Sequence, residues 1–301
     1  MRLVHAGASP TNAHTLVTII ASRSRKAKSV WDRLCRVHAR SALFDLYGDH
    51  LRDRDGWAPI AGIVRLLGAV DVAPPAVRTA VSRMVREGWL EPVERQGQRG
   101  YAATPRARAR LAEAHARIYR TRDESWDGCW HVVVVDHASE RARRGRVAAA
   151  LSYLGYARMA PDTWIAPREN AELAGTLAAE GLQARAFSAR YAAEGAELAE
   201  SLWDLQGLAA AYREFVAQAR TVQADRPADQ GPEAAFAART LLVHEWRKFL
   251  FRDPGLPAQV LPADWPGHEA AVLFDTTASA LLPLAREFVD SCLAPDPKPR
   301  S

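Results

Sequence analysis

The chain has 301 residues, of which 48% are hydrophobic and 25% are charged, and its formal net charge is +5. This length predicts two or three domains, and the composition is typical of a globular protein in water. No apolar run approaches the roughly 18 residues that a membrane-spanning helix needs. The three cysteines, Cys35, Cys129 and Cys292, have no close spacing, which argues against a disulfide framework or a zinc knuckle. We therefore expect a cytoplasmic protein without membrane contact.

The basic residues are distributed unevenly along the chain. Residues 1–122 contain 22 Lys and Arg against 10 Asp and Glu, a net charge of +12, whereas residues 123–301 contain 18 against 25, a net charge of −7. Such an asymmetry indicates a module that faces nucleic acid, joined to one that does not. An uneven surface that only keeps the protein soluble is the alternative. Residues 1–38 are basic and lack clear periodicity, and we expect them to be a disordered extension.

Residues 39–88 predict three short helices, because apolar residues recur there at helical spacing. The three stripes are Leu43, Leu46, Tyr47 and Leu51, then Ile60, Ile63, Val64 and Leu67, then Val77, Val81, Met84 and Val85. Two further segments, 89–94 and 99–103, flank Gln96-Gly97-Gln98 and predict a β-hairpin. Three helices followed by a hairpin is the layout of a winged helix-turn-helix. A helix that begins at Thr104 and Pro105 would connect this module to the rest of the chain.

The third helix and the hairpin carry candidate DNA-binding residues. With the apolar stripe in the core, the outward positions of the helix are Arg78, Thr79, Ser82, Arg83 and Arg86. The residues near the predicted tip of the hairpin are Arg95, Gln96, Gln98 and Arg99. In a winged helix this helix enters the major groove, where arginine binds guanine or phosphate and hydroxyl groups mostly bind phosphate. We expect these residues to contact double-stranded DNA, and Trp89 to pack beneath the hairpin rather than stack on a base.

Residues 123–194 predict a ferredoxin-like domain. A buried strand at 130–136, a helix at 140–155, two strands around Pro161-Asp162, a helix at 168–181 and a strand at 182–191 give the order β-α-β-β-α-β. Residues 195–301 are helical, with a polar linker near 224–232. The sequence therefore predicts an α+β protein with an extension at 1–38, a winged helix with its connector at 39–122, a ferredoxin-like domain at 123–194 and a helical domain at 195–301.

The sequence offers little support for an enzyme. Residues 244–248, HEWRK, begin like a zinc-protease helix, but Lys248 occupies the position of the required second histidine. Asp136 ends the first strand of the ferredoxin-like segment, where it would usually cap the following loop or helix. A dimer that brought two such residues together could instead bind a divalent metal and hydrolyse DNA. We expect no catalytic residue, metal or cofactor, and a metal-dependent nuclease is the alternative.

The helical segment contains one stretch with the composition of a ligand site, between residues 239 and 248. Its basic and aromatic side chains could line a pocket for an anionic ligand with an apolar end. They could equally form a network between helices, in which Arg247 pairs with Glu245 or Asp204. The candidate ligand-binding residues are Trp203, Arg239, His244, Trp246 and Arg247.

Five segments, in the same order, resemble the PaaX family of bacterial transcriptional repressors. They are AVRTAVSRMVREGWL, WDGCWHVVVV, LGYARMAPDTWIAPRE, LWDLQGLAAAYREF and AFAARTLLVHEWRKFLFRDPGLPAQVLPADWPG. The resemblance runs from about Ala39 to the last helix and implies a winged helix, a central domain similar to the Cas2 ferredoxin-like fold, and a C-terminal helical domain. It also implies a homodimer that represses a catabolic operon until an aryl-acetyl-CoA, typically phenylacetyl-CoA, releases it. A DNA-binding protein without an effector is a second alternative.

Overall fold

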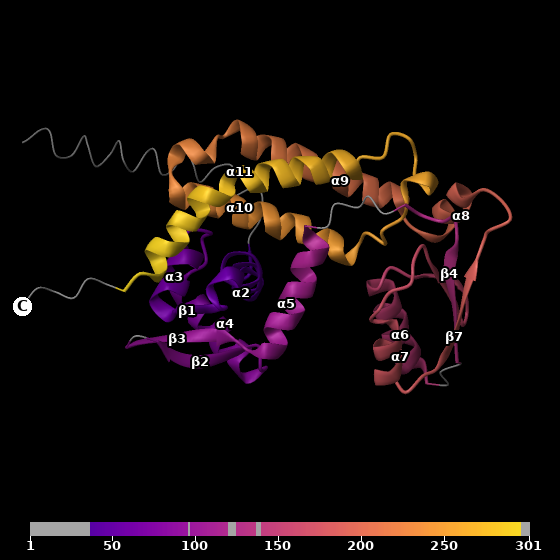
Figure 1. The fold of residues 1–301 in the computed structure, drawn as a ribbon, viewed down its shortest axis with the longest axis horizontal. Coiled ribbons are helices and arrows are strands. Elements are labelled where there is room, and N and C mark those ends of the chain that lie inside the picture. Colours follow the sequence, from indigo (N-terminus) through magenta and orange to yellow (C-terminus); the bar gives the residue numbers. More distant parts are fainter. Residues whose placement is uncertain (1–36, 96, 120–124, 137–139, 296–301) are drawn as a thin grey trace, which may run out of the picture.

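The structure is a computed structural model that describes residues 37–95, 97–119, 125–136 and 140–295. The predicted extension at 1–38 therefore lies almost entirely outside the described residues. Two units that each combine helices and a sheet lie beneath a set of long helices from the C-terminal part of the chain (Figure 1). Among the described residues, no helix is both long and apolar enough to cross a membrane.

The first unit contains the three predicted helices and a small sheet. The helices are α2 (Ala39–Asp45), α3 (Ile60–Gly68) and α4 (Pro74–Arg86), and the strands are β1 (Trp57–Pro59), β2 (Leu90–Arg95) and β3 (Gln98–Ala103). The sheet has the order β1-β3-β2, and both strand pairs are antiparallel. The residues of the apolar stripes that are at most 2% exposed are Leu43, Leu46, Tyr47, Leu51, Ile63, Leu67, Val77, Val81 and Met84. The predicted faces of all three helices are thus buried.

Details of this unit differ from the predictions. The first helix gives way at Leu46 to a π-helical turn, η1 (Leu46–His50), and then to a 3-10 turn, η2 (Arg52–Arg54). Apolar spacing did not reveal this change, because the same side chains stay buried through it. Strand β1 was not predicted, because three residues are too few to show alternation. The hairpin loop has two residues instead of three, since Arg95 pairs with Gln98, and Gly97 (φ 74°) supplies the left-handed conformation that such a loop needs.

Helix α5 (Pro105–Ile118) leaves the first unit as the predicted connector. The Thr104 hydroxyl caps it by accepting a hydrogen bond of 3.3 Å from the backbone N–H of Ala107. Proline in the first turn loses no helical hydrogen bond, because that N–H has no partner within the helix. The start of the connector is therefore as predicted.

The central unit follows the predicted β-α-β-β-α-β order. Its elements are β4 (Trp130–Val135), α6 (Arg141–Tyr153), β5 (Ala157–Ala160), β6 (Thr163–Ala166), α7 (Leu173–Ala179) and β7 (Ala184–Ala189). The sheet order is β5-β6-β4-β7, with antiparallel neighbours throughout. Val133 and Trp164 pack with Leu151 of α6 and Leu177 of α7 on one face of the sheet. On the other face, Trp130 packs against Leu198 of the following helix, α8 (Gly195–Leu202).

The C-terminal part of the chain consists of helices. They are α9 (Leu205–Ala224), η3 (Pro227–Gln230), α10 (Pro232–Trp246), η4 (Arg247–Phe251), η5 (Ala258–Val260) and α11 (Gly267–Leu293). Phe215 of α9, Leu242 of α10 and Phe274 of α11 meet in one core. The three long helices form the upper layer of the molecule in Figure 1.

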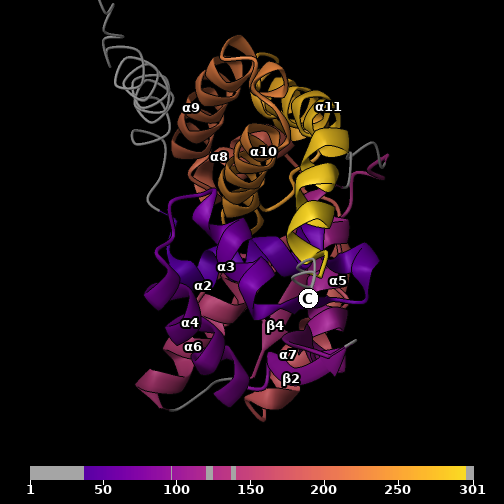
Figure 2. The ribbon, with the colours of Figure 1, turned by 90° about the vertical axis from the view of Figure 1, so that its left-hand side faces the viewer.

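The C-terminal helices share a core with the first unit. Leu43 and Leu67 pack in the same buried cluster as Phe236 of α10 and Val289 of α11. Helices α3 and α11 approach closely at Gly62, where a Cβ atom would lie 2.7 Å from the carbonyl oxygen of Cys292. Figure 2 shows α10 and α11 directly above α2 and α3. The unit that carries α4 is therefore held on the C-terminal helices by continuous apolar packing.

Candidate nucleic-acid interface and ligand cavity

Helix α4 presents its polar side to solvent. Its apolar side packs against α2 and α3, and this turns the predicted residues outward. All five are exposed: Arg78, Thr79, Ser82, Arg83 and Arg86. Helix α4 lies on the far side of α2 from α10, so its outer face points away from the C-terminal helices (Figure 1).

Local contacts separate these five side chains into two groups. The hydroxyl groups of Thr79 and Ser82 donate to backbone carbonyls of their own helix at 2.9 and 3.0 Å. Arg83 forms an ion pair of 3.1 Å with Glu87, one turn further on. Arg78 and Arg86 have no side-chain hydrogen bond or ion pair with any part of the chain that the structure describes. These two arginines are therefore available to a partner without breaking an existing contact.

The hairpin presents one arginine to solvent and holds another against the sheet. Arg99 is exposed on β3. Arg95 is half-buried, with its guanidinium 5.4 Å from the centre of the Trp57 ring and its Nη1 atom 3.4 Å from Oδ2 of Asp55. Gln98 is half-buried opposite Arg95, whereas Gln96 lies outside the described residues.

Trp89, which we expected beneath the hairpin, packs against side chains of α2 and α5. Its ring meets that of Phe44 edge to face, with 4.8 Å between the ring centres. The Arg110 guanidinium of α5 lies 6.0 Å from the Trp89 ring. Trp89 therefore lies at the junction of the hairpin, α2 and α5.

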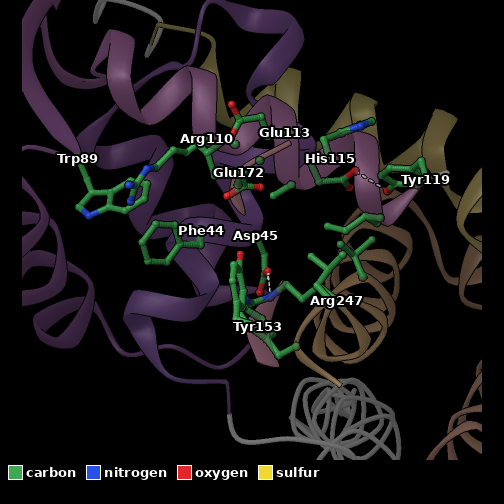
Figure 3. Close-up of a pocket in the computed structure, with 18 residues that line it drawn as sticks. Phe44, Asp45, Trp89, Arg110, Glu113, His115, Tyr119, Tyr153, Glu172 and Arg247 are labelled. Atoms are coloured by element: carbon green, nitrogen blue, oxygen red, sulfur yellow. Dashed lines mark hydrogen bonds and ion pairs between the residues drawn. The ribbon is translucent and has the colours of Figure 1, made fainter. Parts of the chain in front are cut away.

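A cavity of about 490 Å³ lies between the first unit, the central unit and the C-terminal helices (Figure 3). Its aromatic lining comes from all three parts of the chain and consists of Phe44, Trp89, His115, Tyr119, Tyr153 and Phe251. Leu111 and Ala114 of α5 add apolar surface, and Arg110 and Arg247 add positive charge. The lining also includes four acidic residues, which are Asp45, Asp49, Glu113 and Glu172. Cavities of this size with a mostly apolar lining and a few polar groups are typical of small-molecule sites.

Two buried carboxylates form the polar floor beside this cavity. Asp45 of α2 lies with its Oδ2 atom 2.7 Å from Nδ1 of His244 and its Oδ1 atom 2.5 Å from Nε of Arg247. Asp45 Oδ1 and Arg247 Nε each have no hydrogen-bond partner. The contact between them is therefore an ion pair without hydrogen-bond geometry. Figure 3 shows Arg247 directed at Asp45 from the side of η4. These contacts join α2 to the end of α10.

The second carboxylate, Asp49, lies in η1 and joins α5 as well as α10. The hydroxyl of Tyr119 donates to Oδ1 of Asp49 at 2.6 Å, and Arg239 donates to the Tyr119 oxygen at 2.7 Å. Burial raises the pKa of Asp49, but the neighbouring His50 and Arg239 and the hydrogen bonds from Arg239 and Tyr119 outweigh it and hold the pKa below its usual value. Burial raises the pKa of Tyr119 above its usual value. Asp49 is therefore ionised and Tyr119 neutral near pH 7.

The structure distributes the five predicted ligand residues over three places. Arg239 and His244 lie under the first unit, and Arg247 lines the cavity. Trp246 stacks on Phe274 in the helical core, with 4.8 Å between ring centres. Trp203 stacks on Trp130 of the central unit at 5.8 Å. The two tryptophans therefore do not form the walls of one pocket around Arg247.

Arg247 pairs with a carboxylate, as in the alternative of a network between helices, but not with Glu245 or Asp204, the two suggested partners. Glu245 binds Lys248 at 2.6 Å, and Asp204 caps α9 by accepting a 2.8 Å hydrogen bond from Gly207. The partner of Arg247 is Asp45, which is 202 positions earlier in the sequence and gives no local signal of this contact. The long-range partners that sequence reasoning missed are Asp45, Asp49 and Tyr119.

Asp136, the candidate nuclease residue, is half-exposed at the end of β4. It forms an ion pair with Arg185 of β7, with 3.8 Å between Oδ1 and Nη1. Within the described ranges, no three His, Cys, Asp or Glu side chains are grouped as a metal site would require.

The exposed arginines of α4 thus lie beside the β2–β3 hairpin on a unit of three helices. Comparison with known proteins gives the family. The PaaX-like protein family matches residues 38–106, the PaaX protein central Cas2-like domain matches residues 123–201, and the PaaX-like protein C-terminal domain matches residues 203–291. The chain therefore belongs to the PaaX-like protein family, which confirms the resemblance, and its central domain is Cas2-like.

Two individual proteins are similar over most of the chain. The transcriptional repressor PaaX of Escherichia coli (strain K12) is 30% identical over 265 residues, which are 84% of this chain and 83% of that protein. The structure of the uncharacterized protein Rv0674 from Mycobacterium tuberculosis has a TM-score of 0.55 and 24% identity, covering 85% of this chain and 99% of that one. The second likeness shows a common fold.

Proposed function

We propose that this protein is a DNA-binding transcriptional repressor that acts in the cytoplasm as a homodimer and is released from its operator by an aryl-acetyl-CoA. The exposed arginine face of α4, next to a hairpin that exposes Arg99, carries the DNA-binding part of the proposal. Membership of the PaaX-like family and the similarity to a transcriptional repressor support it. Neither observation favours a nuclease.

In this proposal residues 39–122 are a winged helix-turn-helix with its connector, residues 123–194 the ferredoxin-like domain and residues 195–301 the helical domain. Helix α4 enters the major groove, where Arg78 and Arg86 reach base edges or phosphates first, because their guanidinium groups have no contact to break. Arg83 joins them once phosphate competes with Glu87. Arg99 binds the backbone from the hairpin, and Arg95 keeps the hairpin against the sheet. Two copies in a dimer would occupy two half-sites about 34–36 Å apart or at a multiple of that distance.

The cavity between the three parts of the chain is the proposed effector site. Phe44, Trp89, Tyr153 and Phe251 suit an aryl group, and Arg110 and Arg247 suit the anionic remainder of a CoA thioester. A ligand releases the repressor only if it binds the DNA-incompetent arrangement more tightly than the competent one. The walls of this cavity belong to the DNA-binding unit, the central unit and the C-terminal helices. Its shape therefore depends on how the three are placed, so a ligand bound there can have different affinities for the two arrangements.

A binding assay with and without ligand tests the proposal. A labelled duplex is first selected from a random library by the wild-type protein, and its fluorescence anisotropy is then followed as phenylacetyl-CoA is added. We expect release by phenylacetyl-CoA at concentrations at which acetyl-CoA and free CoA leave the complex intact. Failure to select any duplex would contradict the repressor, whereas stable binding that no acyl-CoA reverses would contradict only the effector. Sedimentation of the free protein as a monomer at micromolar concentration would contradict the homodimer.

A further inference from the structure

A second basic surface lies on the central unit, at the beginning of α6. Arg141, Arg143, Arg144 and Arg146 all fall within the first six residues of this helix. They are four of the eight arginines in residues 123–201, which also contain twelve Asp and Glu. Arginine in the first turn of a helix meets the positive end of the helix dipole, so this placement does not stabilise α6 itself. The concentration of four arginines at the start of α6 therefore requires another reason.

Two of these arginines hold the unit together. Arg146 pairs with the Glu180 carboxylate at 3.0 Å, and Arg143 donates to the backbone carbonyl of the same residue. The pKa of Glu180 is lowered, and the hydrogen bond from Arg146 is the largest cause. Arg143 and Arg146 therefore join α6 to the end of α7.

The other two arginines border a hollow. Arg141 and Arg144 line a depression of about 330 Å³ at the end of β4, together with Arg158 of β5. The Arg158 guanidinium is fixed there, because it donates to the Pro161 carbonyl at 2.7 Å and lies 6.0 Å from the centre of the Trp164 ring. Two carboxylates, those of Asp136 and Asp162, share the hollow. Three guanidinium groups against two carboxylates leave the surface positive in an otherwise acidic unit.

The hollow lies on the same side of the molecule as α4. Tyr153, at the end of α6, contacts Phe251 of η4 with 5.6 Å between ring centres. Arg141 is at the opposite end of the helix, about 18 Å away at 1.5 Å per residue. Figures 1 and 2 both show the start of α6 at the level of α4 and the hairpin, on the side away from α9, α10 and α11.

We propose that Arg141, Arg144 and Arg158 form a second contact with the phosphate backbone of the duplex that α4 binds, an inference that rests on the proposed function. A duplex stays nearly straight over a few helical turns, because its persistence length is about 150 base pairs. In this proposal the axis of the duplex runs from α4 toward the central unit, along the face on which the hollow lies. Because the ligand cavity separates the two units, an effector that moves them apart breaks the two-point contact.

Salt dependence measures this contact directly. The double variant Arg141→Gln/Arg144→Gln is titrated onto a labelled 30-base-pair duplex of mixed sequence between 50 and 300 mM KCl, because phosphate contacts do not require an operator. Each lost contact lowers the slope of log K against log salt by about 0.9, so we expect a slope shallower by about 1 to 2 for each protomer bound. The control Arg213→Gln/Arg220→Gln removes the same charge from α9, where both side chains are exposed, and should keep the wild-type slope.

Two further comparisons separate the possible failures. The single variant Arg141→Gln is used in case the double variant unfolds. It removes a side chain that has no partner among the described residues. It should lower the slope of log K against log salt by about 1. The second contact would be overturned if the folded single and double variants keep the wild-type slope while Arg78→Gln weakens binding. That result would not contradict the proposal that the protein is a DNA-binding repressor. Wild-type protein that does not bind the duplex at 50 mM KCl would overturn both.

Discussion

Arg239 of α10 and Asp49 of η1 form a buried, two-pronged ion pair across 190 residues of sequence. The Nε–Oδ2 distance is 2.9 Å and the Nη2–Oδ1 distance is 2.8 Å, and both side chains are 5% exposed. Arg239 also donates to the backbone carbonyl of Ala278 in α11. One guanidinium thus connects the first unit with two C-terminal helices. Arg239, which the sequence suggested as a ligand-binding residue, therefore links the first unit to α10 and α11.

Breaking this pair should destabilise the protein strongly. Asp49→Leu leaves the Arg239 charge buried without its carboxylate, and we expect a loss of about 3–5 kcal/mol in the free energy of unfolding. The double variant Asp49→Leu/Arg239→Met removes both charges and should recover part of this loss. Urea unfolding followed by circular dichroism measures both variants. A loss below about 1 kcal/mol in Asp49→Leu would show that Arg239 finds another partner or solvent.

Acidification should destabilise the same interface through His50. Burial lowers the pKa of His50 to about 4 in the folded protein, and its Nε2 atom lies 2.9 Å from the Thr240 hydroxyl of α10. The unfolded chain, with an ordinary histidine pKa of about 6.5, therefore binds the proton more tightly between pH 4 and 6.5. Stability from this group is complete above pH 6.5 and decreases as the pH falls toward 4.

We expect the free energy of unfolding to decrease by about 2 kcal/mol between pH 7.5 and pH 5 because of His50. The variant His50→Gln should show a smaller decrease over this range in urea titrations at both pH values. His115→Gln is the matched control, since burial also lowers the pKa of His115 but the ring is half-buried. An equal decrease in the wild type and in His50→Gln would contradict the assignment.

The two hairpin arginines should behave differently. Arg99→Ala removes an exposed charge, so it should weaken binding to all duplexes alike and lower the salt slope by about 0.9 for one phosphate contact. Arg95→Ala removes a side chain that covers Trp57, and its effect should fall more on the melting temperature. Anisotropy titrations at several salt concentrations and thermal melts separate the two. Loss of affinity for one base pair alone in Arg99→Ala would mean that the hairpin reads sequence.

Filling the cavity should uncouple ligand from DNA. Ala114 of α5 lines the cavity, and Ala114→Trp places an indole where the aryl group would bind. We expect phenylacetyl-CoA affinity to decrease at least tenfold in calorimetry, about 1.4 kcal/mol or more, with DNA affinity near that of the wild type. Ala112→Trp, on the exposed side of the same helix, is the control and should bind ligand normally. Normal ligand affinity in both variants would exclude this cavity as the effector site.

Much of the fold could be predicted from the sequence, because the signals are local. The apolar stripes of α3 and α4 have helical spacing, and the same spacing defines which arginines of α4 face solvent. The segments 89–94 and 99–103 on either side of Gly97 predict the hairpin, and the alternation of strand and helix patterns predicts the central unit. These patterns depend on neighbours within one or two turns of the chain. The resemblance to the family, based on five ordered segments, added the long-range arrangement of domains.

The cavity and its polar floor could not be predicted, because their residues meet only in the folded chain. Asp45 and Asp49 belong to a helix whose apolar stripe was evident, yet their partners lie in α10 and η4, far along the sequence. Trp203 and Trp246 were expected as walls of a ligand pocket at the basic segment 239–248. Each is instead covered by an aromatic neighbour of its own core, Trp130 or Phe274. Composition near a site did not indicate which side chains the fold brings to it.

The proposed readout of DNA by α4 is tested most directly by comparing two duplexes. The wild-type protein and Arg78→Ala/Arg83→Ala are titrated onto the selected duplex and onto a scrambled one at the same salt concentration, with Arg213→Ala as the control. The wild type should prefer the selected duplex by at least about 10³-fold. The double variant should lose most of this preference at an unchanged melting temperature, because each base-reading arginine contributes about 1–3 kcal/mol. A folded double variant that keeps the wild-type preference would contradict the assignment of α4 as the DNA-reading helix.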